Sequence, residues 1–125
     1  MKRDMDLVRK LLIVMEEEEF HTAISENFLP KIEGYREELI FYHMQIMSQA
    51  GLLHLEKDEY PIDQNQKIVT RYYSLSWDGH EFLDAARDNK RWEKAKAAMT
   101  AIGGFSIDVV KQLLIQYMKE QLKLT

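Results

Sequence analysis

The 125-residue chain contains no cysteine, only two prolines and only five glycines. The lack of cysteine excludes a thiolate nucleophile, a disulfide, and the paired cysteines of zinc and redox sites. The low glycine and proline content excludes collagen and Pro- or Gly-rich disordered chains. With 46% apolar and 30% charged residues, the composition indicates one soluble globular domain that can bury a core without a disulfide, a metal or a partner.

Long apolar runs are also absent. The longest, residues 11–15, is far shorter than the roughly 20 residues of a membrane-spanning helix. The first four residues lack the apolar segment and the small-residue cleavage site of a signal peptide, so we expect the mature chain to start where it is encoded. We therefore expect a cytoplasmic protein without membrane association, a setting that also suits a chain without cysteine.

The formal charge of −4 argues against a strongly basic nucleic-acid-binding protein, although it averages two unequal parts. Residues 1–82 carry 9 basic and 16 acidic side chains, a net charge of −7, whereas residues 83–125 carry 8 and 5, a net charge of +3. Either a binding face or a solvated helix surface produces such an asymmetry, and the solvated surface is the commoner cause.

Helical periodicity is clear at two places in the first half. Asp4 can cap a helix over residues 4–19, whose apolar residues lie on one face. Residues 36–50 have a broader apolar face that includes His43, and Gly51 supplies the left-handed residue that ends this helix. We expect His43 to be buried and hydrogen-bonded. Between the two helices, the alternation in residues 31–33 indicates a short strand.

The second half begins with a predicted hairpin. Residues 52–56 and 67–76 indicate two antiparallel strands, because the second segment is rich in Ile, Val, Thr and Tyr. The polar residues 57–66 between them are expected to form a long loop. Ser76 can cap the next helix, a helical pattern continues around Trp92, and Ser106 opens a last helix. For Gly103 and Gly104 we expect a hinge or a helix cap.

The order helix, short strand, helix, hairpin, helix is that of a winged helix, and several segments resemble known proteins. Residues 42–53 (YHMQIMSQAGLL) resemble the recognition helix and wing entry of bacterial winged helix-turn-helix repressors, and residues 75–83 (LSWDGHEFL) resemble the segment after their wing. Residues 1–12 (MKRDMDLVRKLL) and 79–88 (GHEFLDAARD), with a following Trp92, resemble an uncharacterised family found in bacterial and phage genomes.

This resemblance implies a winged-helix-like fold, a bacterial cytoplasmic setting, frequent phage or prophage association and no established activity. The expected fold class is therefore α+β and mostly helical. A winged-helix-like domain would occupy residues 1–88, and a C-terminal helical extension over residues 89–125 would pack on it as one compact domain. The chain departs from the repressor pattern between its first two helices, where the space for a separate helix is short and irregular.

Two functional hypotheses remain open, and both describe a non-enzymatic regulator or accessory protein. In the first, the chain binds DNA through the recognition-like helix and the wing, with amide side chains at bases and cations at phosphates. The side chains that could make these contacts are Arg36, Gln45, Gln49, Lys67 and Arg71. In the second, the scaffold binds a protein. Glu37 and Glu38 would repel phosphates, and an outward Phe41 suits a protein contact.

Signatures of catalysis are missing. The chain has no Gly-rich phosphate loop, no nucleophile elbow and no Rossmann fingerprint. Its histidines have no partners at metal-ligand spacing. We therefore expect no enzyme activity, no cofactor and no metal site. The basic residues around Trp92 could touch phosphate, but a solvated face with Trp92 in the core is the simpler interpretation.

The last helix has a wide apolar stripe, wider than one-sided docking requires. We expect a homodimer built partly on this helix. The alternative is that both sides of the stripe pack within one chain. The residues of the expected interface are Ile107, Val110, Leu114, Tyr117 and Met118.

Overall fold

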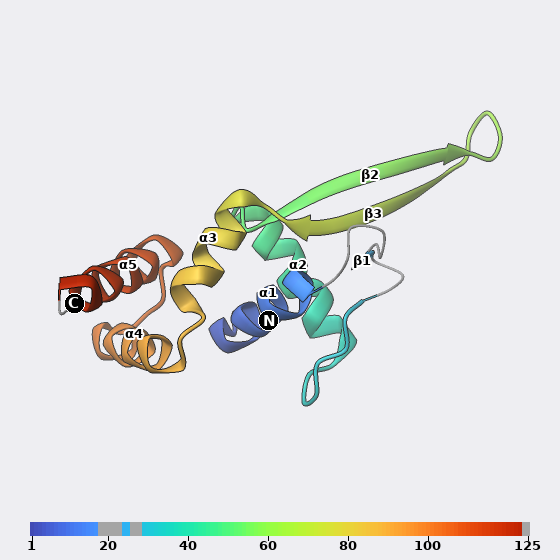
Figure 1. The fold of residues 1–125 in the computed structure, drawn as a ribbon. Helices are drawn as coiled ribbons and strands as arrows, with labels where there is room; N and C mark the ends of the chain where they lie inside the picture. The colour runs from blue at the N-terminus through green and yellow to red at the C-terminus, as the bar shows by residue number, and fades with distance from the viewer. Residues whose placement is uncertain (18–23, 26–28, 124–125) are drawn as a thin grey trace. The chain divides into compact units, whose positions relative to one another are not determined.

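The structure, a computed structural model, describes residues 1–17, 24–25 and 29–123. In these residues the chain is α+β and mostly helical, as predicted (Figure 1). The elements, in chain order, are α1 (Met5–Glu17), β1 (Ile24–Ser25), α2 (Glu37–Gln49), β2 (Leu53–Pro61), β3 (Lys67–Leu75), α3 (Trp77–Ala86), α4 (Asn89–Ile102) and α5 (Ile107–Lys123).

The chain separates into two compact units, Met1–His80 and Glu81–Thr125. The boundary between the units lies inside α3. The division into residues 1–88 and 89–125 stays a prediction. The expectation that both parts pack as one compact domain stays a prediction.

The core of the first unit is formed mainly by α1 and α2, with Leu52, Leu53 and Tyr73 at the base of the hairpin. The Leu7 N–H donates to Asp4 Oδ1 at 3.1 Å, so Asp4 caps α1 as predicted. His43 of α2 is fully buried. Its Nε2 accepts a hydrogen bond from the Asp4 N–H at 2.8 Å, and its Nδ1 lies 2.9 Å from the Leu39 carbonyl oxygen. These two contacts require a neutral ring with hydrogen on Nδ1, and they confirm the buried, hydrogen-bonded His43.

The strands form a three-stranded antiparallel sheet in the order β1-β3-β2. The predicted strand at residues 31–33 is wrong. Gly34 has a left-handed φ of 87°, and the Tyr35 N–H donates to the Ile32 carbonyl at 3.2 Å. These residues therefore form a turn. The short strand is instead β1, which pairs with Tyr72 and Tyr73 of β3.

The predicted long loop over residues 57–66 is also wrong. β2 continues to Pro61, which pairs with Lys67, so the turn spans only residues 62–66. The Asp63 side chain closes this turn by accepting hydrogen bonds from the N–H groups of Asn65 (2.8 Å) and Gln66 (2.9 Å). Polar residues can extend a strand here because both faces of the outer hairpin meet water.

The base of the hairpin is held by the first turn of α3. The Ser76 N–H donates to the Leu52 carbonyl at 3.2 Å, and the Ser76 hydroxyl donates to the Gly51 carbonyl. The same hydroxyl oxygen accepts the Gly79 N–H at 2.9 Å, which confirms Ser76 as the helix cap. Gly79 is buried, and a Cβ at this position would overlap the Leu52 carbonyl oxygen.

The second unit contains the paired helices α4 and α5. Asp88 caps α4 by accepting the Arg91 N–H at 2.9 Å. Gly103 ends this helix with a φ of 90°, so the expected helix cap is confirmed. Trp92 is buried, as the simpler interpretation required, and its ring meets Phe82 edge-on at 6.4 Å between centroids. The other buried residues of these helices are Ala95, Met99, Val110 and Leu114.

The contact at Gly79 gives a direct test of the fold. We expect Gly79→Ala to lower the free energy of unfolding by about 2–3 kcal/mol, because the added methyl group forces α3 away from the Leu52 carbonyl. Urea denaturation measures this loss. The matched control is Gly104→Ala, where an added Cβ meets no atom within 4 Å and φ is not left-handed. Equal stability of the two variants would contradict the proposed contact.

Candidate binding surfaces

The proposed DNA-contacting residues of α2 do not form one cluster. Gln45 and Gln49 are exposed and lie one turn apart on the same face. Arg36 is exposed at the extended residue before the helix, and its carbonyl accepts the first helical N–H groups. It lies nine residues before Gln45, about 13 Å along the helix axis. Glu37 and Glu38, both exposed, occupy the first turn next to Arg36.

The hairpin does bring its predicted cations together. Lys67 and Arg71 are four residues apart on β3, so their side chains lie on the same face. Lys57, directly opposite Arg71 in the register, shares that face. We call this surface, defined by Lys57, Lys67 and Arg71, the cationic face. Glu59 lies on it too and forms an ion pair with Lys67 at 3.3 Å between Oε2 and Nζ.

Lys57 is not among the predicted DNA-contacting residues, because residues 57–66 were expected to form a loop. The alternation of side chains along a strand could have placed Lys57 on a face apart from its acidic neighbours. If residues 56–59 continue the strand, Glu56 and Asp58 must lie on the face opposite Lys57. The structure has this arrangement.

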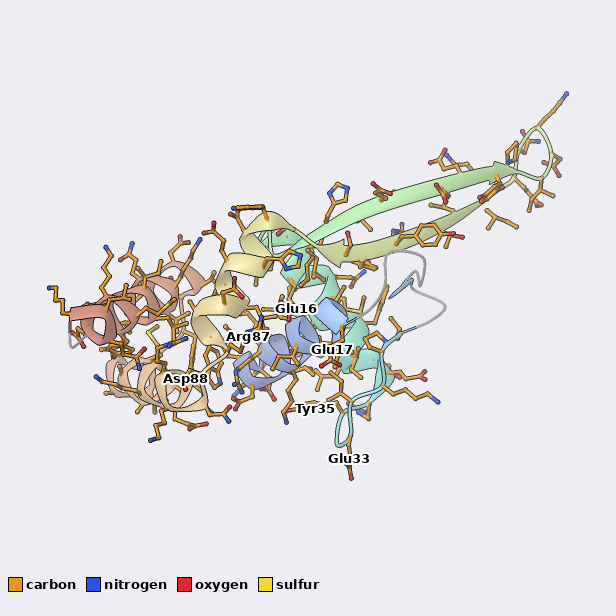
Figure 2. All side chains as sticks on the ribbon, in the orientation of Figure 1. Glu16, Glu17, Glu33, Tyr35, Arg87 and Asp88 are labelled. Atoms are coloured by element: carbon orange, nitrogen blue, oxygen red, sulfur yellow. The ribbon has the colours of Figure 1, made fainter. Side chains whose placement is uncertain are left out.

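The opposite surface of the hairpin is aromatic and acidic. We call it the tyrosine face, and it is formed by the even-numbered residues of both strands, which include Glu56, Asp58, Tyr60, Ile68 and Tyr72. Tyr60 and Ile68 are direct cross-strand partners and are 57% and 52% exposed. Side chains stand out from both sides of the hairpin along its length (Figure 2).

Asp58 of β2 and Tyr72 of β3 interact across the two strands on the tyrosine face. Desolvation by surrounding atoms raises the pKa of the Tyr72 hydroxyl above its ordinary value, and the charges of Asp58 and Tyr60 raise it further. These interactions favour the protonated form of the hydroxyl.

The predicted interface on α5 is only partly accessible. Val110 and Leu114 are fully buried within the chain, and Ile107, Tyr117 and Met118 are partly buried. Tyr117 is covered by Lys94, whose Nζ lies 4.2 Å from the ring centroid. Exposed apolar side chains of the same helix continue beside this stripe at Ile115 (37%) and Leu122 (72%). Dimerisation stays a prediction.

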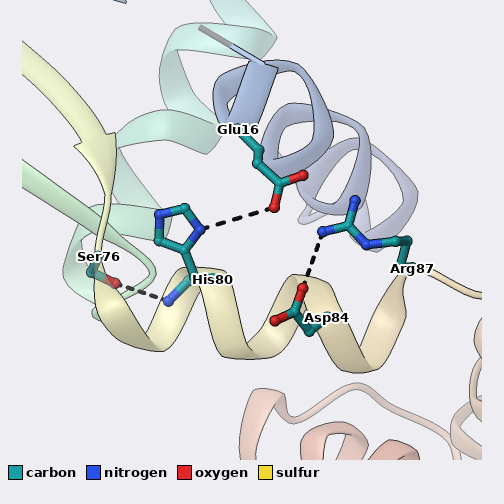
Figure 3. Close-up of polar contacts among 6 residues, drawn as sticks. Glu16, Ser76, His80, Asp84 and Arg87 are labelled. Atoms are coloured by element: carbon teal, nitrogen blue, oxygen red, sulfur yellow. Dashed lines mark hydrogen bonds and ion pairs between the residues drawn. The ribbon is translucent and has the colours of Figure 1, made fainter. Parts of the chain in front are cut away.

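Two of the basic residues around Trp92, Arg87 and Arg91, have contacts within the second unit. The Arg91 guanidinium donates to the carbonyls of Asp84 and Ala85 and to Gln121 Oε1, the last at 2.8 Å. Arg87 forms an ion pair with Asp84 at 3.1 Å (Figure 3). These contacts support the interpretation of this cluster as a charged helix surface.

Histidine, aspartate and glutamate side chains are the groups of this cysteine-free chain that could bind a metal ion. His80 Nδ1 lies 4.0 Å from Glu16 Oε2, and both side chains are partly exposed (Figure 3). Within the part of the chain that the structure describes, no three such side chains gather in a way that could hold a metal ion. Across the same residues, none of the helices has the length and apolar character that crossing a bilayer requires.

The chain resembles other proteins over most of its length. Residues 2–106 match the model of the family described as "Hypothetical protein (DUF2513)". An "Uncharacterized protein" of Haemophilus influenzae (strain ATCC 51907 / DSM 11121 / KW20 / Rd) is 30% identical over 115 residues, which cover 90% of this chain and 92% of the relative. No solved structure matches significantly. Since the family model spans most of the chain, the protein belongs to the DUF2513 family.

Proposed function

We propose that this chain is a winged-helix-like accessory or regulatory protein of bacteria and their prophages, and that it acts in the cytoplasm by binding a protein partner rather than by catalysis. The observation that carries the proposal is the exposed apolar end of the hairpin. Tyr60, Ile62 and Ile68 are 57%, 59% and 52% exposed. Exposed apolar side chains gathered at one place are typical of protein-binding surfaces.

The length of the hairpin supports this role. Nine residues of each strand pair, but buried side chains occur only near the base, at Leu53 and Tyr73. A two-stranded ribbon without a core beneath it is only marginally stable in water. A partner that covers the apolar end would stabilise the hairpin.

The order of elements supports a winged-helix scaffold, with α2 in the place of the recognition helix and β2 and β3 as the wing. Its fit to DNA is weaker. Residues 29–36, the described part of the segment between β1 and α2, form no helix, whereas a helix-turn-helix uses two helices at the groove. The acidic first turn of α2 further disfavours contact with phosphates.

DNA binding is the second candidate function, because of the cationic face. Lys57, Lys67 and Arg71 lie together on one side of the wing, where a winged helix contacts the DNA backbone. Arg36, Gln45 and Gln49 would supply the remaining contacts.

Capture from a nuclease-treated lysate of the source bacterium tests the protein-binding proposal. We expect the tagged wild-type chain to retain specific proteins. The amount retained by Tyr60→Ser/Ile68→Ser should be lower by about tenfold or more, because buried aromatic and aliphatic anchors dominate such interfaces. Both side chains are exposed, so the variant should fold. The control is Lys57→Gln/Arg71→Gln on the opposite face, which should retain the same proteins. Equal capture by the two variants would refute the apolar end as the binding surface.

Electrophoretic mobility shifts at two salt concentrations test the second candidate. So few cations imply weak binding. The affinity should fall only gradually with salt concentration, as expected when about two to four phosphate charges are neutralised. Arg36→Ala/Arg71→Ala should weaken binding to all sequences, whereas Gln45→Ala should change sequence preference more than strength. An unchanged affinity of the double arginine variant would eliminate docking through α2 and the wing.

We also infer a homodimer that uses α5. Since Val110 and Leu114 are buried within the chain, the contact would be made by Met118 and the exposed Ile115 and Leu122, which follow one another along one stripe. Light scattering at high protein concentration should give a dimer mass for the wild type and a monomer mass for Ile115→Asp/Leu122→Asp. A monomer mass for the wild type would end this idea.

A further inference from the structure

The hairpin separates its charges by face. Within it, the three cations Lys57, Lys67 and Arg71 all lie on the cationic face. The tyrosine face carries no Lys or Arg, but it carries Glu56 and Asp58. The two faces therefore suit ligands of opposite charge, although their residues alternate along the same strands.

The acids of the tyrosine face lie among aromatic rings. Asp58 is two residues before Tyr60 on β2, and it interacts with the hydroxyl of Tyr72 on β3. Glu56 is the direct cross-strand partner of Tyr72, and its Oε1 lies 3.2 Å from Nε2 of His54 on the same face. A carboxylate that accepts one hydrogen bond still has free lone pairs. Tyrosine rings attract cations, so a Lys or Arg side chain placed here would meet both a carboxylate and a ring.

The far end of the same face is apolar. Tyr60 and Ile68 lie directly opposite each other, and more than half of each side chain is exposed. An apolar side chain of a ligand could pack there, next to the acidic part at Asp58. The face thus offers two neighbouring subsites, one for a cation and one for an apolar group.

We propose that the tyrosine face binds a segment of the partner protein in which Lys or Arg stands beside a large apolar residue. This inference rests on the proposed function and adds the chemistry of the partner. DNA is a poor ligand for this face, because Glu56 and Asp58 would repel its phosphates.

Three synthetic 12-residue peptides probe the proposal with the full chain. They repeat Ser-Ile-Lys, Ser-Ile-Glu or Ser-Ser-Lys four times, so that the charge and the apolar residue vary separately. Amide chemical shifts of the isotope-labelled protein report both affinity and location. We expect the Ser-Ile-Lys peptide to bind at least tenfold more tightly than the other two, with shifts centred on residues 56–60 and 68–72, and to weaken as salt is added.

Variants of the protein identify the groups involved. Glu56→Gln/Asp58→Asn should lower the affinity for the Ser-Ile-Lys peptide about tenfold. The control Lys57→Gln/Arg71→Gln, on the opposite face of the same strands, should leave its affinity unchanged or raise it slightly, since it removes cations near a cationic ligand. Absence of binding at millimolar peptide, equal affinity for the Lys and Glu peptides, or shifts confined to the cationic face would each overturn the proposal.

Failure here is distinguishable from failure of the proposed function. If natural partners are captured through Tyr60 and Ile68, yet are captured equally well by Glu56→Gln/Asp58→Asn, protein binding stands and the cationic partner is refuted. If no protein is captured and the Ser-Ile-Lys peptide still binds at the tyrosine face, the surface chemistry stands and the function is refuted.

Discussion

The geometry of the first unit depends on the absence of a Cβ at Gly79. This absence allows the first turn of α3 to lie against the Leu52 carbonyl, where any Cβ would collide. Ser76 then bonds to the residues on both sides of this contact. β2 begins at Leu53 and β3 ends at Leu75. These contacts therefore hold both strands at the base of the hairpin. The direction in which the hairpin leaves α2 is therefore set here.

Most helix ends could be predicted because they depend on neighbouring residues alone. Asp4, Ser76 and Ser106 each precede a helix and accept an N–H from its first turn, as short polar side chains do at N-caps. Gly51 and Gly103 follow helices with left-handed φ values of 83° and 90°. The position of the short strand could not be found this way. β1 is defined by pairing with Tyr72 and Tyr73, almost fifty residues along the chain, and alternation over three residues is too short a signal to compete with such pairing.

The extent of β2 was underestimated for a related reason. Residues 57–60 are mostly charged, and a charged run after a short apolar strand is typical of a loop. In the structure, the β-rich β3 supplies the pairing partner for each of these residues. Charged side chains on β2, which lies at the edge of the sheet, also disfavour pairing with another chain. The feature that suggested a loop thus has a physical use in an edge strand.

The interpretation of the candidate surfaces depends strongly on whether residues 56–59 form a loop or a strand. As a loop, residues 56–59 are a mixture of three acids around one lysine and favour no particular ligand. As a strand, they place Lys57 beside Arg71 on one face and Glu56 and Asp58 beside Tyr72 on the other. Alternation along a strand is enough to place Lys67 with Arg71 and to separate Lys57 from Glu56 and Asp58. The cross-strand register is needed to place Lys57 on the same face as Arg71. Since the two faces attract opposite charges, binding of DNA and binding of a basic protein segment need not compete for the same surface.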